Sequence, residues 1–319
     1  TNLGNLYYFQ GELDKTLAFY DQAIVVFAKL GEKRGEVQVR LNRASISLNV
    51  LGNSSQVRED ALFSLDYAEE VNDPISKGQA LTLLAESERQ SGEREAARQH
   101  LEEGIVVMEA AGDQWLLVQE YRGLALLDIL EEKPEQALES LERALAISEE
   151  LGMANLIPPM IALRGLAFLQ QNRLDEALEA TSEAMKQMKP DIEQVYLLPY
   201  WHSQVLAALG RHDEEETAIE EAYRLLKKSL SGLPDELQKI SLEQVQDHRA
   251  ILSAWESLQP TCISVELNKI GESNETVEIK WTISLPEDAR IKGKVARRHH
   301  RLLRLLEETE KEGAIASHQ

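Results

Sequence analysis

The sequence contains a single cysteine, Cys262, among its 319 residues, so no disulfide can form within the chain. Its cysteine content therefore gives no sign of an oxidising compartment. Aromatic residues are also scarce, at 5% of the chain, whereas hydrophobic residues of all kinds make up 43%. Most apolar burial must therefore come from alanine and leucine side chains that interdigitate, as they do between packed helices.

Long apolar runs are missing as well. No segment approaches the roughly 18 consecutive apolar residues that a membrane-spanning helix needs. The chain does not open with a signal-peptide pattern either. We therefore expect no membrane partner and a cytoplasmic location.

Catalytic and metal-binding motifs are absent from the sequence. There is no G-x-x-x-x-G-K-[ST], H-E-x-x-H, C-x-x-C or G-x-S-x-G pattern. The seven histidines do not stand at metal-ligand spacing, and the adjacent His299 and His300 would point about 100° apart on a helix. We expect no enzyme activity, no cofactor and no metal site, which leaves binding as the function.

Acidic residues outnumber basic ones in the sequence, which has a formal net charge of -21. Runs such as Glu149-Glu150 and Glu214-Glu215-Glu216 indicate solvated outer helix faces. A field of this sign repels nucleic acid, and no basic stripe offsets it over the first two thirds of the chain.

A repeated frame of small residues organises that part of the sequence. Ala137, Leu141 and Ala144 share one helical face at i, i+4 and i+7, which lets a neighbouring helix approach closely. The same small-x6-small frame recurs at Thr16/Ala23, Ala61/Ala68, Ala97/Gly104, Ala177/Ala184 and, less cleanly, Glu215/Ala222. The steps are 45, 36, 40, 40 and 38 residues, and we attribute the long first step to a turn in the second repeat with about four extra residues. A period in this range predicts a solenoid of helix pairs.

The first copy also carries a family resemblance. The stretch LGNLYYFQGELDKTLAFYDQAI resembles a tetratricopeptide repeat, with Leu3, Gly4, Tyr7, Tyr20 and Ala23 at the spacing of that family. The resemblance covers roughly residues 1–230. With a period near 40, it is closer to the variant found in large bacterial signalling and transcription regulators. It implies a mainly α fold, a right-handed α-solenoid of about six helix pairs. We interpret the opening GNLYYFQGE as part of this repeat and expect the chain to be a fragment of a longer protein.

Three further segments follow the repeats. Residues 231–258 predict capping helices, and the alternating segments within 261–285 predict a small β-hairpin. Residues 286–319 predict a basic helix and tail, since seven basic and no acidic residues lie between Ala289 and Leu305.

The basic helix has more than one interpretation. Its candidate partner-contact residues are Arg297, Arg298, Arg301 and Arg304. They could contact the acidic repeats, a second copy of the chain in a homo-oligomer, or nucleic acid. The segment resembles the leading helix of a helix-turn-helix module in bacterial regulators, but no recognition helix follows before Gln319. We therefore expect weak or no sequence-specific nucleic-acid binding by this chain.

The resemblance also implies where a ligand binds. In tetratricopeptide arrays the first helices of successive repeats line a concave groove. Transferring that frame places eight amide, aromatic and arginine side chains on the inner face: Asn42, Asn49, Gln79, Arg89, Gln119, Arg122, Tyr200 and Gln204. Such groups bind peptide backbone or carboxylate, although they are equally compatible with an ordinary solvated surface.

The main hypothesis is a non-enzymatic sensor and interaction module of a larger bacterial regulator. It would bind a protein, a peptide or a small effector in the groove. One alternative is a self-associating scaffold that pairs acidic repeats with the basic C-terminal segment. A weaker one is a DNA-associated role through the basic helix.

Overall fold

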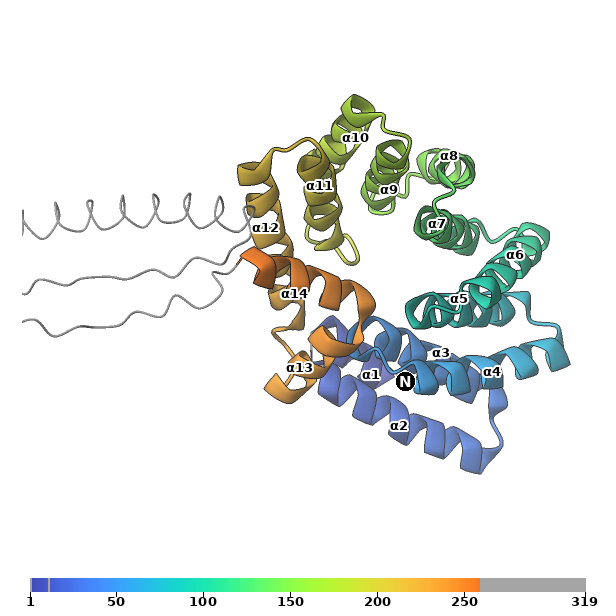
Figure 1. The fold of residues 1–319 in the computed structure, drawn as a ribbon. Helices are drawn as coiled ribbons and strands as arrows, with labels where there is room; N and C mark the ends of the chain where they lie inside the picture. The colour runs from blue at the N-terminus through green and yellow to red at the C-terminus, as the bar shows by residue number, and fades with distance from the viewer. Residues whose placement is uncertain (1, 11, 259–319) are drawn as a thin grey trace, which may run out of the picture. The chain divides into compact units, whose positions relative to one another are not determined.

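The computed structural model describes residues 2–10 and 12–258, and within these ranges all regular secondary structure is helical (Figure 1). The chain divides into two compact units, Thr1–Ala254 and Trp255–Gln319, and the described residues belong almost entirely to the first. The β-hairpin predicted for 261–285 and the basic helix predicted for 286–319, with Arg297, Arg298, Arg301 and Arg304, lie outside the described residues.

Six helix pairs follow one another along the first unit, from blue to yellow in Figure 1. The first three are α1 (Asn2–Phe9) with α2 (Leu13–Leu30), α3 (Lys33–Ile46) with α4 (Ser54–Val71), and α5 (Pro74–Ser91) with α6 (Arg94–Ala111). The next three are α7 (Gln114–Leu130) with α8 (Pro134–Glu150), α9 (Ile157–Gln170) with α10 (Leu174–Lys186), and α11 (Leu197–Ala208) with α12 (His212–Leu230). Each helix packs on the next, so the α-solenoid expected from the repeats is confirmed.

Local sequence sets where these helices begin and end. Asp73 caps α5 by accepting hydrogen bonds from the amides of Ile75 and Ser76, and Pro74 occupies the first turn, where its missing N–H costs nothing. Gly92 ends the same helix at φ 82°, a left-handed conformation that glycine adopts without strain. Caps of this kind recur between pairs, which keeps the turns short and adjacent helices antiparallel.

The small-residue frame forms the contacts between helices. Ala137, Leu141 and Ala144 are all 0% exposed on α8. Close approach is tightest at glycines, because a Cβ at Gly78 would lie 2.5 Å from Cε of Met108. The core is thus an Ala/Leu core with a few large side chains set against small ones, as expected from the low aromatic content.

The register expected for the second repeat is wrong by one helical turn. The turn is only Gly52 and Asn53, and α4 begins at Ser54. The fourth and eleventh residues of α4 are Val57 and Ser64, which match Ala97 and Gly104 of α6 with a step of 40 residues. Ala61 and Ala68 lie on the same buried face one turn further along, so the small-residue pattern alone could not separate the two registers.

In the corrected register α4 starts 41 residues after α2 and α6 starts 40 residues after α4, so this repeat has one extra residue, which lies in its first helix. The end of α3 continues into a π-helical turn, η1 (Ser47–Leu51), which ends at Gly52 with φ 61°. Wide turns of this kind are often found at functional sites. Here η1 carries Leu48 and Asn49, both of which line the cavity described below.

The last two described helices, α13 (Asp235–Gln244) and α14 (Gln246–Leu258), return to the beginning of the array (Figure 1). Helix α13 packs against η1, and Lys227 of α12 donates a hydrogen bond to Gln238 of α13. The region expected to cap the last repeat therefore also contacts the second repeat. This return closes the array around an interior cavity.

Candidate functional site

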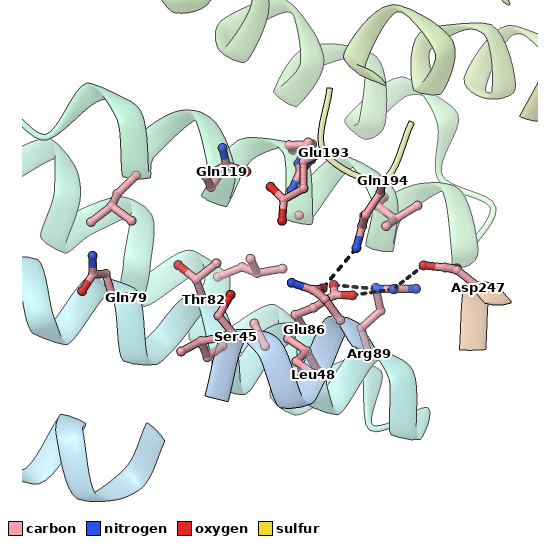
Figure 2. Close-up of a pocket in the computed structure, with 18 of the residues that line it drawn as sticks. Ser45, Leu48, Gln79, Thr82, Glu86, Arg89, Gln119, Glu193, Gln194 and Asp247 are labelled. Carbon is pink, nitrogen blue, oxygen red and sulfur yellow. Dashed lines mark hydrogen bonds and ion pairs between the residues drawn. The ribbon is translucent and has the colours of Figure 1, made fainter. Parts of the chain in front are cut away.

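The interior cavity has a volume of about 320 Å³. Its walls come from α3, η1, α5, α6, α7, α9, the segment before α11, α11 and α14. Half of the lining is apolar and includes Leu41, Leu83, Leu163 and Trp201. The other half carries amide, hydroxyl, guanidinium and carboxylate groups, several of them labelled in Figure 2. A mainly preformed pocket with a few convergent polar groups is the usual form of a small-ligand site.

Six of the eight side chains expected in the groove line this cavity: Asn42, Asn49, Gln79, Arg89, Gln119 and Arg122. The other two, Tyr200 and Gln204, do not line it and stand one turn apart on α11. Burial is the main reason why the pKa of Tyr200 is raised, and the negative charge of Asp247 adds to the effect. Tyr200 therefore lies beside the cavity wall.

Arg89 is the most completely engaged of the six. Its side chain is 4% exposed, and it donates from Nε and Nη2 to the two carboxylate oxygens of Glu86 (2.7 and 2.6 Å). It also donates to Gln246 of α14 (3.4 Å). A further bond joins it to Asp247 of α14 (3.2 Å), as Figure 2 shows. Burial lowers the pKa of Arg89 most, but Glu86 and Asp247 outweigh that effect and raise it. The structure thus gives Arg89 a role in joining α5 to α14.

The two carboxylates of this network differ. Burial raises the pKa of Glu86, but the charge of Arg89 and its hydrogen bonds more than compensate, and the pKa lies below its ordinary value. Burial likewise raises the pKa of Asp247, and here Arg89 compensates only in part. Glu86 is therefore the carboxylate that fixes the guanidinium, and Asp247 is the weaker partner brought in by α14.

A second contact closes the cavity from the side of α11. Gln194, in the segment before α11, donates a hydrogen bond of 3.1 Å from Nε2 to Oδ1 of Asn49 in η1. Neighbouring Glu193 lines the cavity but is exposed, so it stands at the edge. This bond joins the segment before α11 to the second repeat, and the ion pair between Arg89 and Asp247 joins α14 to the third repeat.

Three of the six predicted side chains that line the cavity are left available. Among the described residues, Gln79, Gln119 and Arg122 have no hydrogen bond or ion pair with another protein group. Gln79 and Gln119 stand 40 residues apart, at equivalent positions of successive repeats on α5 and α7. Arg122 lies one turn after Gln119 on α7. These groups can bind a ligand without breaking an existing contact.

Glu120, next to them on α7, points into the helix packing. It is 0% exposed, and its Oε1 lies 2.6 Å from the hydroxyl of Thr82, a cavity residue. A Cβ at Gly104 would lie 2.5 Å from that oxygen, so the glycine makes room for the carboxyl. Burial raises the pKa of Glu120 to about 8, against a smaller lowering effect of Thr82. This carboxyl is therefore largely neutral at neutral pH.

Sequence reasoning missed Glu86, Glu193, Gln194 and Asp247 as cavity residues. Glu86 could not be distinguished from the many other glutamates of the sequence, although it stands one turn before Arg89 on the same helix. The other three reach the cavity only because the array closes. No signal in the sequence places residues 193–194 or 247 next to the second and third repeats.

No cluster of three or more histidine, cysteine, aspartate or glutamate side chains in residues 2–10 and 12–258 could hold a metal ion. Within the same ranges, no helix combines the length and apolar character needed to cross a bilayer.

Known proteins resemble the chain in structure only. No protein-family model and no curated protein sequence matches it. The apo form of RapI superposes with a TM-score of 0.54 at 12% identity, over 78% of this chain and 96% of that one. BtubC (BKLC) from P. vanneervenii gives 0.53 at 16% identity, over 69% and 93%.

A third structure carries the repeat in its description. It is a signal transduction ATPase with numerous domains, a STAND protein, with a tetratricopeptide repeat sensor, from Pyrococcus horikoshii. Its TM-score is 0.53 at 18% identity, over 75% of this chain and 37% of that one. The fold is tetratricopeptide-like. At these identities the likeness shows the fold alone.

Proposed function

We propose that the chain is a non-enzymatic sensor and interaction module that belongs to a larger bacterial regulator. It binds an effector, or a short segment of a protein partner, inside this cavity. The observation that carries this proposal is the cavity itself. Its walls come from several repeats and from the returning helix α14, and its polar groups include side chains with no partner among the residues that the structure describes.

The arrangement suits a sensor because the cavity and the closing contacts share residues. Arg89 lines the cavity and also holds Asp247 of α14, and Asn49 lines it and accepts the bond from Gln194. A ligand that shifts these side chains changes the strength of closure, which is the differential contact that a conformational response requires. The similar STAND protein is described as using its tetratricopeptide repeats as a sensor.

A matched pair of variants tests whether binding occurs in the cavity. Ser45→Phe places a large side chain in the cavity from α3, whereas Arg34→Phe adds the same side chain on the exposed start of that helix. We expect a compound or peptide that raises the Tm of the wild-type chain to raise that of R34F equally. It should leave the Tm of S45F unchanged. Equal stabilisation of both variants would place the ligand elsewhere and refute the cavity as the site.

The scaffold and DNA-associated alternatives depend on the basic residues from Arg290 to Arg304, which lie outside the described residues. No contact within residues 2–258 favours either of them, so neither replaces the sensor proposal.

A further inference from the structure

The size of the cavity restricts what can occupy it. The cavity offers about 320 Å³. This is near the lower end of the range of roughly 300–1,000 Å³ that is usual for small-ligand pockets. The cavity therefore has room for a small molecule or for the extended end of a chain.

Arg122 determines the charge of that occupant. Its guanidinium offers five N–H donors, and none of them meets an acceptor among the described residues. Its charge acts on Glu86, whose pKa Arg122 helps to lower. Both oxygens of Glu86 already accept hydrogen bonds from Arg89, and one accepts another from Gln90. The fork of Arg122 is thus free for an anionic group of the ligand.

The surrounding charges favour a carboxylate over a phosphate. Glu86 and Asp247 also line the cavity, and the exposed Glu193 stands at its edge. A phosphate with a charge near -2 would be repelled by these groups more strongly than a carboxylate with a charge of -1. A single planar carboxylate also matches the two parallel N–H bonds that one arginine can donate.

Gln79 and Gln119 determine what lies next to the carboxylate. Each amide offers donors and an acceptor with no protein partner, and the two occupy equivalent positions on adjacent first helices. A ligand amide supplies one N–H and one C=O, which such side chains can bond simultaneously. The apolar half of the lining, with Leu83, Leu163 and Trp201, is suited to a hydrocarbon portion.

We propose that the cavity binds an amide-containing monocarboxylate, with the carboxylate on Arg122 and the amide on Gln79 and Gln119. An N-acylated amino acid and the carboxyl-terminal end of a short peptide both have this chemistry. The inference rests on the proposed function, because it names the ligand class for the same cavity.

The test compares defined probes by calorimetric titration and Tm shift. The probes are a pool of tripeptides with free carboxyl termini, the same pool with amidated termini, a pool of N-acetyl amino acids, and inorganic phosphate. We expect the free tripeptides or the N-acetyl amino acids to bind, whichever is the source of the carboxylate. The amidated pool and phosphate should not bind. Arg122→Gln should weaken binding by about tenfold to a hundredfold.

The control variant is Arg224→Gln, which removes an exposed arginine of α12 that pairs only with Glu221 on its own helix. Its affinity should equal that of the wild-type chain. R122Q should also melt close to the wild-type temperature, since Arg122 donates no hydrogen bond to a described residue and acts on Glu86 only through its charge. Retained affinity in R122Q, or failure of both free-carboxylate pools to bind, would overturn the proposed ligand class. If the amidated pool binds and S45F abolishes that binding, the ligand class fails but the cavity function stands.

Discussion

Glu120 is a buried carboxyl whose burial favours its neutral form. The hydroxyl of Thr82 lies 3.0 Å from the carbonyl oxygen of Gly78 and 2.6 Å from Oε1 of Glu120. A hydroxyl has one proton to donate, so Thr82 can stabilise a charged Glu120 only when it does not donate that proton to Gly78. The second carboxyl oxygen, Oε2, is buried without a partner, a position that would be costly for a charged group.

We predict that the stability of the chain declines between about pH 4.3 and pH 8 because of Glu120. The folded pKa, about 8, lies above the unfolded value. The folded state therefore binds the proton more tightly, and stability is full at low pH and is lost as the pH rises through 8.

Urea unfolding of Glu120→Gln at pH 5 and pH 8 measures the effect. The amide cannot ionise, so the variant should be more stable than the wild-type chain at pH 8 by on the order of 1–4 kcal/mol, with little gain at pH 5. Glu102→Gln, an exposed position on α6, serves as the control and should change neither value. If E120Q and the wild-type chain differed in stability by the same amount at both pH values, the raised pKa of Glu120 would be contradicted.

At the scale of elements, Gly52 controls how closely α13 can approach η1. It stands at φ 61°, and a Cβ there would lie 2.7 Å from the carbonyl carbon of Gln244 and 2.9 Å from the nitrogen of Val245. These are backbone atoms at the end of α13, so they cannot give way as a flexible side chain could. The return of the C-terminal helices therefore depends on the absence of a side chain at this position.

Gly52→Ala should loosen α13 and α14 from the second repeat. Gly92→Ala is the matched control, since Gly92 has a similar φ of 82° but open space around its Cβ position. Both variants carry the left-handed backbone strain of about 1–2 kcal/mol. Only G52A should also increase amide hydrogen exchange in α13 and α14. Equal exchange in the two variants would show that the closing contact does not hold these helices in place.

The repeated frame allowed the sequence to predict the packing of α8. Ala137, Leu141 and Ala144 are buried as expected, because i, i+4, i+7 spacing is a local property of a helix. The groove side chains on α3, α5 and α7, such as Asn42 and Arg122, were implied by the resemblance to tetratricopeptide repeats. The closure could not be predicted, because the bond between Arg89 and Asp247 joins residues 158 positions apart with no repeated pattern at one end. For the same reason Arg89 was expected to bind a ligand but is engaged within the protein.

At the scale of the whole molecule, the distribution of charge bears on whether copies of the chain associate with one another. The chain carries -21 overall, yet seven basic and no acidic residues lie between Ala289 and Leu305. The sensor function needs no second copy, so we expect a mass of 35.9 kDa by light scattering in both low and high salt. A larger mass that appears only in low salt would instead support the self-associating scaffold, since salt screens attraction between exposed charges.

Closure of the array also has a consequence for the order of folding. Contacts between adjacent helices are local and can form as each repeat stacks on its neighbour. The bonds from Arg89 to Asp247 and from Gln194 to Asn49 bridge 158 and 145 positions, and they become favourable only after the intervening repeats have stacked. We expect them to form last and, in the native state, to break first. The interior could then exchange with solvent by a subglobal opening that leaves all six helix pairs folded.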